Sequence, residues 1–219
     1  MKISFHKKDV VFGGLLVIVL FIITSTGYTR FEAVHKYMDG FIKFSVLATM
    51  GELLSIRIAI GRWQKAAGIF WRVMLWGAFG IGVTLMFTLF SEGVIGAQRK
   101  GLLPDNHLLL TAFFASATMN ATSGPVMMAM QRIGTTYIDL KYEQGKASLK
   151  RAVASVDWVA FLSLEVFITI PCIWIPANTV VFLMPEKMRI LVAALLSMVL
   201  GLILTVGKIK SHQKKIIHN

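Results

Sequence analysis

The sequence has 219 residues, of which 56% are hydrophobic and 16% are charged, and its net charge is +12. Soluble domains are about 45–50% apolar and about 25% charged, so this composition excludes a water-soluble globular protein and also a disordered one. The single cysteine, Cys172, excludes a disulfide scaffold. No gap between the apolar runs is long enough to form its own core, so we expect one integral membrane domain over residues 1–219.

Apolar runs divide the chain into segments of membrane-spanning length. They cover residues 10–27, 41–61, 69–90, 107–130, 157–183 and 188–207. The sequence therefore predicts an all-α bundle of about six transmembrane helices, or four or five if the first run is only interfacial or the second lies partly outside the bilayer. Lys2, Lys7 and Lys8 precede the first run as they would precede a signal peptide. Because no small-residue cleavage site follows, we expect this helix to be retained.

Prolines interrupt two of these runs. Proline removes a backbone donor and clashes with the preceding turn of a helix. We therefore expect Pro171 and Pro176 to bend or end the fifth run. We also expect Gly124-Pro125 to break the fourth helix and to free backbone carbonyls toward a cavity.

The distribution of basic residues predicts the orientation of the chain. With the N-terminus in the cytoplasm, most loop lysines and arginines fall on the inner side, including those before residue 9, between 132 and 151 and after 207. Both termini are therefore predicted to be cytoplasmic. The longest polar stretch, residues 131–156, is predicted to be an interfacial connector between the fourth and fifth helices. The positive charge favours contact with anionic lipids, and we expect no nucleic-acid partner.

Polar side chains recur on one face of three helices, at spacings of three and four residues. The stripes are Ser45, Thr49 and Glu52 in the second helix, Ser116, Asn120 and Ser123 in the fourth, and Glu165, Thr169 and Cys172 in the fifth. A carboxylate at mid-bilayer costs at least about 2.5–3.5 kcal/mol, so Glu52, Asn120 and Glu165 are expected to face the bundle interior. The stripes then either line a polar pathway or hydrogen-bond neighbouring helices together.

Two cations of the second helix, Lys43 and Arg57, point away from its stripe and lie near its opposite ends. We expect both side chains to extend to the membrane interfaces, with Arg57 as a counter-charge at one mouth of the pathway. Stripes of small residues, by contrast, indicate close helix packing. They are Gly77, Gly80, Thr84 and Thr88 in the third helix, and Ala193, Ser197, Gly201 and Thr205 in the last.

The sequence carries no pattern typical of catalysis or of cofactor binding. The five histidines are scattered without metal-ligand spacing, and there is no phosphate-binding loop and no nucleophile elbow. We therefore expect no enzyme activity, no catalytic residues, no metal and no cofactor.

Three patches of sequence are similar, in their order and spacing, to a known family. They are Gly51-Glu52, Gly124-Pro125 followed by Tyr137, and a last stretch with Trp174, Pro176, Phe182, Pro185 and Arg189. Over about residues 41–210 the chain resembles the Mpv-seventeen / peroxisomal-membrane-protein-twenty-two family of small multi-pass proteins. Glu stands where the family usually has Asp, and Met-Gln replaces a Trp-Tyr pair after Gly-Pro, which indicates a distant, bacterial member.

The resemblance implies an integral membrane protein of a kind proposed to form small-solute channels. Together with the polar stripes, it predicts passage of an unassigned small solute or ion through the bundle core. The alternatives are a substrate-binding subunit of an energy-coupled importer, docking through Gly13-Gly14, and a non-transporting scaffold. The expected partners are the lipid bilayer, anionic lipids and the solute, and assembly of several copies stays open. The expected location is the bacterial plasma membrane, or an organelle membrane if the chain is eukaryotic.

Overall fold

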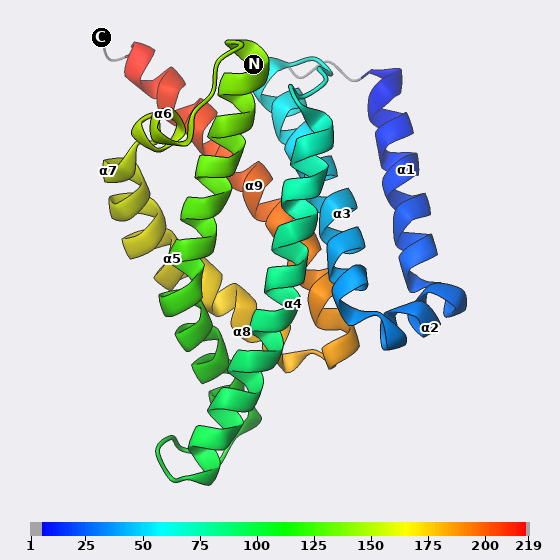
Figure 1. Ribbon diagram of the computed structural model, residues 1–219, viewed down its shortest axis with the longest axis vertical. Coiled ribbons are helices and arrows are strands. Elements are labelled where there is room, and N and C mark those ends of the chain that lie inside the picture. The colour runs from blue at the N-terminus through cyan, green and yellow to red at the C-terminus, as the bar shows by residue number, and fades with distance from the viewer. Residues whose placement is uncertain (1–5, 218–219) are drawn as a thin grey trace.

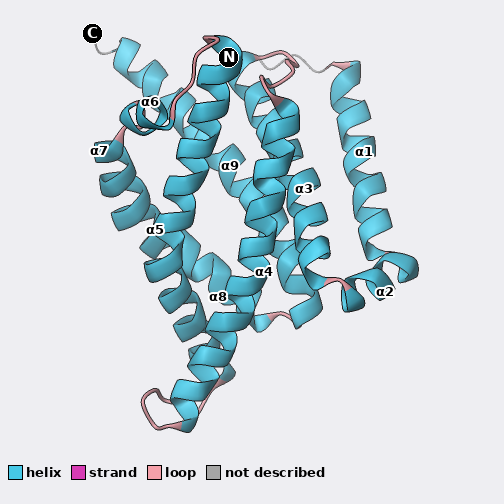
Figure 2. Ribbon diagram, viewed as in Figure 1, coloured by secondary structure: helices cyan, strands magenta, loops and turns pink. Residues whose placement is uncertain are grey.

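The computed structural model describes residues 6–217, and for residue 200 and residues 203–217 it describes the backbone alone. Within this part of the chain every regular element is a helix, which confirms the all-helical prediction (Figure 1, Figure 2). The predicted orientation used Lys2 and the basic residues after residue 207, and the predicted small-residue stripe of the last helix included Thr205. Their side chains lie outside the described part.

The helices follow the predicted apolar runs. They are α1 (Lys7–Thr24), α2 (Thr26–Val34), α3 (Lys36–Ile60), α4 (Ile69–Arg99), α5 (Leu108–Glu143), α6 (Leu149–Ala154), α7 (Trp158–Ala160), the π-helix η1 (Phe161–Trp174), α8 (Ile175–Leu183) and α9 (Glu186–Ile217). The six predicted runs correspond to α1, α3, α4, α5, the continuous stretch from α7 to α8, and α9. The sequence does not predict the short helices α2 and α6.

Two helical stretches in the described part are long and apolar enough to cross a membrane, Ile69–Arg99 and Trp158–Leu183. A third is obtained if α1 and α2, which meet at a bend of 61°, count as one broken span. The number of candidate spans is below the six predicted for two reasons. Lys43, Glu52 and Arg57 interrupt the apolar run of α3, and hydroxyl and amide side chains lower the mean hydropathy of α5. The last predicted run extends into residues whose side chains are not described.

None of the three prolines predicted to disturb their helices ends one. This corrects the predicted break at Gly124-Pro125, and of the two outcomes predicted for Pro171 and Pro176 it excludes the ending of the helix but not a bend. α5 continues through Pro125 without a break. Pro171 lies inside η1, a wider helix in which the Ile175 N–H donates to the carbonyl of Ile170, five residues earlier. Pro176 stands in the first turn of α8, where its fixed φ suits a helical start. The stretch from α7 to α8 therefore continues past both prolines.

Within the bundle, α3 packs against both α4 and α9, while α5 packs against α4 and α8 (Figure 1). α1 stands at one edge of the bundle (Figure 1). The start of α1 and the end of α9 lie at one end of the bundle, which we call the terminal end (Figure 1). The opposite end, here the distal end, holds α2, the start of α3 and the connections from α4 to α5 and from α8 to α9 (Figure 1).

Glycines bring the backbones of α3 and α4 into contact. A Cβ atom added to Gly40 would lie 2.7 Å from the carbonyl oxygen of Gly80, and one added to Gly80 would overlap the carbonyl of Gly40. Gly77 faces the ring of Phe41 just as closely. These contacts confirm that the small-residue face of α4 is a packing surface. Gly51 plays the same part between α3 and α9, where an added Cβ would lie 3.0 Å from Met198 Cα.

The predicted connector over residues 131–156 is not a single polar loop. Residues 131–143 continue α5, and residues 149–154 form α6. Ile138 and Leu140 are buried and give α5 an apolar face beyond the predicted span. Gly145, with φ of 71°, then turns the chain just past the helix end, in the left-handed conformation that favours glycine.

Candidate functional site

A cavity of about 660 Å³ opens at the distal end, among α2, α3, α4 and α9. Seven charged residues line it. The acids are Glu32, Asp39, Glu92 and Glu186, and the bases are Lys36, Lys187 and Arg189. Pockets for small molecules usually measure about 300–1,000 Å³. The cavity therefore has room for a small solute and is the leading candidate site.

A buried ion network adjoins the inner part of the cavity. The ammonium of Lys43, which is 1% exposed, lies 2.9 Å from the Asp39 carboxylate and 3.2 Å from the Glu32 carboxylate. The Tyr28 hydroxyl donates to Asp39 Oδ1 at 2.8 Å. The prediction that Lys43 extends to the membrane interface is therefore wrong. Two carboxylates hold its charge inside the bundle, where a lone ammonium would be costly.

Arg189 forms the basic wall on α9. Its guanidinium donates to the carbonyls of Met184 and Phe182, at 3.0 and 2.9 Å, and to Ser91 Oγ of α4 at 3.0 Å. It also lies over the Phe182 ring. Among the described residues, no carboxylate forms an ion pair with it. Three residues of the family-like stretch, Phe182, Pro185 and Arg189, thus meet at this wall.

One exposed ion pair joins α3 to α9 beside the cavity. Lys36 Nζ lies 2.8 Å from Glu186 Oε1, and the two side chains are 62% and 65% exposed. The hydrogen bond between them lowers the pKa of the Glu186 carboxyl and raises the pKa of the Lys36 ammonium. Both groups are therefore charged at neutral pH. Exposed pairs of this kind are weak, so this one opens at little cost.

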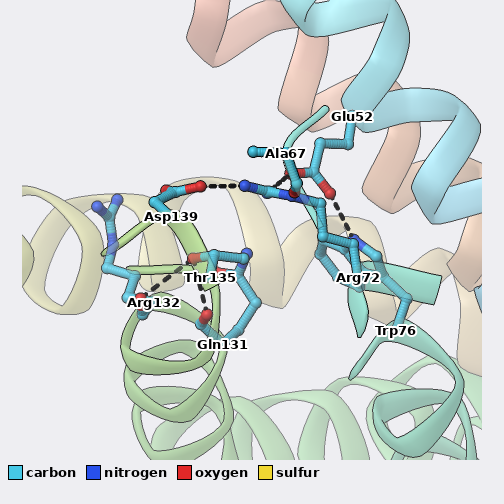
Figure 3. Close-up of polar contacts among 8 residues, drawn as sticks. All are labelled: Glu52, Ala67, Arg72, Trp76, Gln131, Arg132, Thr135 and Asp139. Carbon is cyan, nitrogen blue, oxygen red and sulfur yellow. Dashed lines mark hydrogen bonds and ion pairs between the residues drawn. The ribbon is translucent and has the colours of Figure 1, made fainter. Parts of the chain in front are cut away.

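A second, partly buried cluster centres on Arg72, in the first turn of α4 (Figure 3). Its guanidinium pairs with Glu52 of α3 and with Asp139 of α5, and donates to the Ala67 carbonyl at 2.8 Å. The Trp76 indole donates to the second oxygen of Glu52 at 3.0 Å. Glu52 therefore faces the interior, as predicted, and the cluster ties three helices together.

Replacing Arg72 with glutamine is expected to lower the free energy of unfolding by about 3–5 kcal/mol, because Glu52 would stay buried without its cation. Asp139→Asn is the matched control. The Asp139 side chain is 43% exposed, so water compensates for the lost pair and the loss is smaller. Chemical unfolding in detergent measures both, and equal losses would contradict the central role of Arg72.

Arg57 is also buried rather than extended to an interface. It pairs with Asp9 of α1 through Nε at 3.0 Å and Nη2 at 3.1 Å, and the Trp63 indole donates to the same carboxylate at 2.7 Å. The pair lies away from the distal cavity, and Arg57 is not among the residues that line that cavity. Its role is to attach α1 to α3.

The remaining stripe residues form local contacts at separate places. Asn178 of α8 donates to the amide oxygen of Asn120 at 3.1 Å, and the Ser116 hydroxyl donates to the Ile175 carbonyl at 2.7 Å. Glu165 pairs with Arg132 of α5. These contacts fit the interpretation in which polar groups join helices, and Asn178 is a member that the spacing did not identify.

Four further predicted residues have no part in the cavity. The Thr169 hydroxyl donates to the carbonyl of Leu164 within η1. Thr49 Oγ1 and Trp174 Nε1 are buried and have no hydrogen-bond partner among the described residues. Gly124 packs near Ile170, where an added Cβ would lie 3.5 Å from its side chain.

The predicted pathway residues therefore do not converge on one site. Glu52, Asn120 and Glu165 belong to three separate clusters, and none of them lines the cavity. The charged cavity residues lie near helix ends. The sequence analysis used the basic residues of such segments only to predict which side of the membrane they face. The usable signal was the pair of acids Glu32 and Asp39 shortly before Lys43, with Asp39 one helical turn before it.

The cavity, the two buried ion clusters and the candidate spans define an all-helical protein with features of the membrane class. No protein-family model matches the chain, no curated protein matches it, and no solved structure matches it.

Proposed function

We propose that this chain is a multi-pass membrane protein that passes small solutes or ions through its helix bundle, with the distal cavity as one opening. The observation that carries the proposal is the cavity of about 660 Å³ together with the buried Asp39–Lys43–Glu32 network beside it. Ionisable groups within membrane segments are costly, and they usually face a bundle interior or a water-filled cavity.

In this proposal six spans cross the bilayer: α1, α3, α4, α5, the stretch from α7 to α8, and α9. An even number agrees with the start of α1 and the end of α9 at one end of the bundle (Figure 1). That end also holds basic residues: Lys7 and Lys8 begin α1, and Arg62 lines a small pocket with them. By the positive-inside rule it faces the cytoplasm and anionic lipids, so the cavity opens to the other side of a bacterial plasma membrane.

Two barriers would then control passage. The first is the Asp39–Lys43–Glu32 network together with the adjoining Gly40–Gly80 contact of α3 and α4. The second is the cluster of Arg72, Glu52 and Asp139 between the cavity and the cytoplasmic side. Ion pairs suit such a role because their members can exchange partners with a charged or polar solute.

The resemblance to the Mpv-seventeen / peroxisomal-membrane-protein-twenty-two family supports the same proposal. Pro185 and Arg189, which carry part of that resemblance, line the cavity, and Phe182 contacts Arg189. We propose membership of this family on those residues, and with it a channel-like function.

Reconstitution in liposomes tests the proposed function. Purified protein is expected to raise leak of glycerol and alanine, or ion conductance, above that of protein-free vesicles. Glu52→Gln is expected to raise the flux severalfold, because it removes one of the two carboxylates that hold Arg72. Glu165→Gln is the matched control, because Glu165 is half-buried like Glu52 and is paired with an arginine but lies outside both barriers.

Two outcomes would contradict parts of this proposal. If wild-type protein and Glu52→Gln are both folded and inserted, and neither raises any flux above the vesicle baseline, the bundle is not a pathway. If Glu165→Gln alters flux as strongly as Glu52→Gln, the barrier is not at Arg72.

One observation favours the importer-subunit alternative. Gly13 and Gly14 of α1 have no neighbour within 4 Å of an added Cβ, so this face of α1 is open to a partner helix. Co-purification of an ATPase subunit that is lost in Gly14→Leu would support that alternative.

A further inference from the structure

The charges around the distal cavity are divided between two walls. α2, α3 and α4 contribute three acids (Glu32, Asp39 and Glu92) and one base (Lys36), whereas α9 contributes two bases (Lys187 and Arg189) and one acid (Glu186). A binding site with opposite charges on facing walls discriminates solutes by charge distribution as well as by size.

The acidic wall has more negative charge than its own cation offsets. Lys43 lies between Asp39 and Glu32 and balances only one of them. Glu92 is exposed and forms no ion pair among the described residues. An ammonium group in the cavity would therefore find carboxylates that are not fully compensated.

The basic wall has the opposite excess. Arg189 uses three N–H groups on two carbonyls and one hydroxyl, all neutral acceptors, which leaves two of its five N–H donors. The nearby carboxylate Glu186 is already paired with Lys36. Lys187 adds a second cation without an ion-pair partner in the described part. A carboxylate in the cavity would meet two free positive charges.

We infer that the cavity selects a small zwitterion of the α-amino-acid class. Its carboxylate would bind Arg189 and Lys187, and its ammonium would lie toward Asp39, Glu32 and Glu92. This inference rests on the proposed function and names the solute class of that same cavity. A purely anionic or cationic solute would be attracted to the wall of opposite charge and repelled by the other wall. A neutral solute would leave the charges of both walls unpaired.

Flux of four small probes tests this selectivity: alanine as the zwitterion, lactate as the anion, choline as the cation and glycerol as the neutral solute. Each is measured in proteoliposomes and corrected for protein-free vesicles. Alanine is expected to pass at least about tenfold faster than each of the others, which corresponds to one charge-assisted hydrogen bond. If lactate, choline or glycerol passes as fast as alanine, the inference is overturned while the proposed function stands. If no probe passes, the proposed function itself fails.

Variants of the two walls assign the selectivity to the cavity. Lys187→Gln and Glu92→Gln change exposed side chains and are expected to fold, and each is expected to reduce the preference for alanine severalfold. Arg189→Gln is expected to abolish it, with thermal unfolding as the check that the variant still folds. Lys100→Gln, an exposed cation at the same end but outside the cavity, is the matched control and is expected to change nothing. Unchanged selectivity in Lys187→Gln and Glu92→Gln would overturn the assignment.

Discussion

Gly80→Ala is expected to destabilise the bundle by about 1–3 kcal/mol or more, the usual cost of forcing an added group into a close-packed site. The added methyl group would overlap the backbone carbonyl of Gly40, and a backbone cannot move aside as a flexible side chain can. The two helices would have to separate along their whole contact. Chemical unfolding in detergent measures the loss.

Gly93→Ala is the matched control on the same helix. No atom lies within 4 Å of a Cβ added to Gly93, and alanine favours a helix over glycine by about 0.5–1 kcal/mol. The two substitutions are chemically identical and are expected to act in opposite directions. If both change stability equally, the backbone contact between α3 and α4 does not hold the bundle together.

Lys43→Met is expected to lower the free energy of unfolding by about 3–5 kcal/mol, the usual cost of breaking a buried ion pair from one side. Methionine keeps the length of the side chain but leaves Asp39 and Glu32 without their cation. Asp39 is 2% exposed and Glu32 is 14% exposed, so water can replace little of the lost interaction. The loss comes from the stranded carboxylates rather than from packing.

Lys36→Met tests this explanation on the same helix. Lys36 also pairs with a carboxylate, but both members are largely exposed, so the expected loss is below about 1 kcal/mol. Adding Asp39→Asn to Lys43→Met is expected to restore part of the stability, because it removes one stranded charge. A double variant less stable than Lys43→Met would contradict the stranded-charge account.

Much of the fold could be predicted because apolar runs identify helices whatever surrounds them. The boundaries of α3, α4, α5 and α9 lie close to those runs or extend beyond them. α2 was missed because Thr26–Val34 mixes polar and aromatic residues, and its start depends on Ser25, whose hydroxyl accepts the Tyr28 N–H. The continuity past Pro171 was missed because the proline rule assumes α-helical geometry, whereas η1 is wider.

The candidate site was harder to predict, because helical spacing places residues on one face but does not say which face meets which. Glu52 was expected inside and lies inside, but its partners Arg72 and Asp139 come from helices that spacing cannot orient. Lys43 and Arg57 were expected to reach the interfaces because their acids, Glu32 and Asp9, belong to other helices. Only the tertiary arrangement shows that these charges are matched.

The ion pairs also have an order in time. In four contacts, Asp9 with Arg57, Glu52 with Arg72, Arg72 with Asp139 and Arg132 with Glu165, the partner belongs to a helix made later in synthesis. The earlier member of such a pair therefore lacks this partner until the helix that carries the partner has been made. The ion pair of Lys36 has the largest sequence separation of these pairs, because its partner Glu186 follows 150 residues later. The pair beside the cavity can therefore form only after the first turn of α9 has been made.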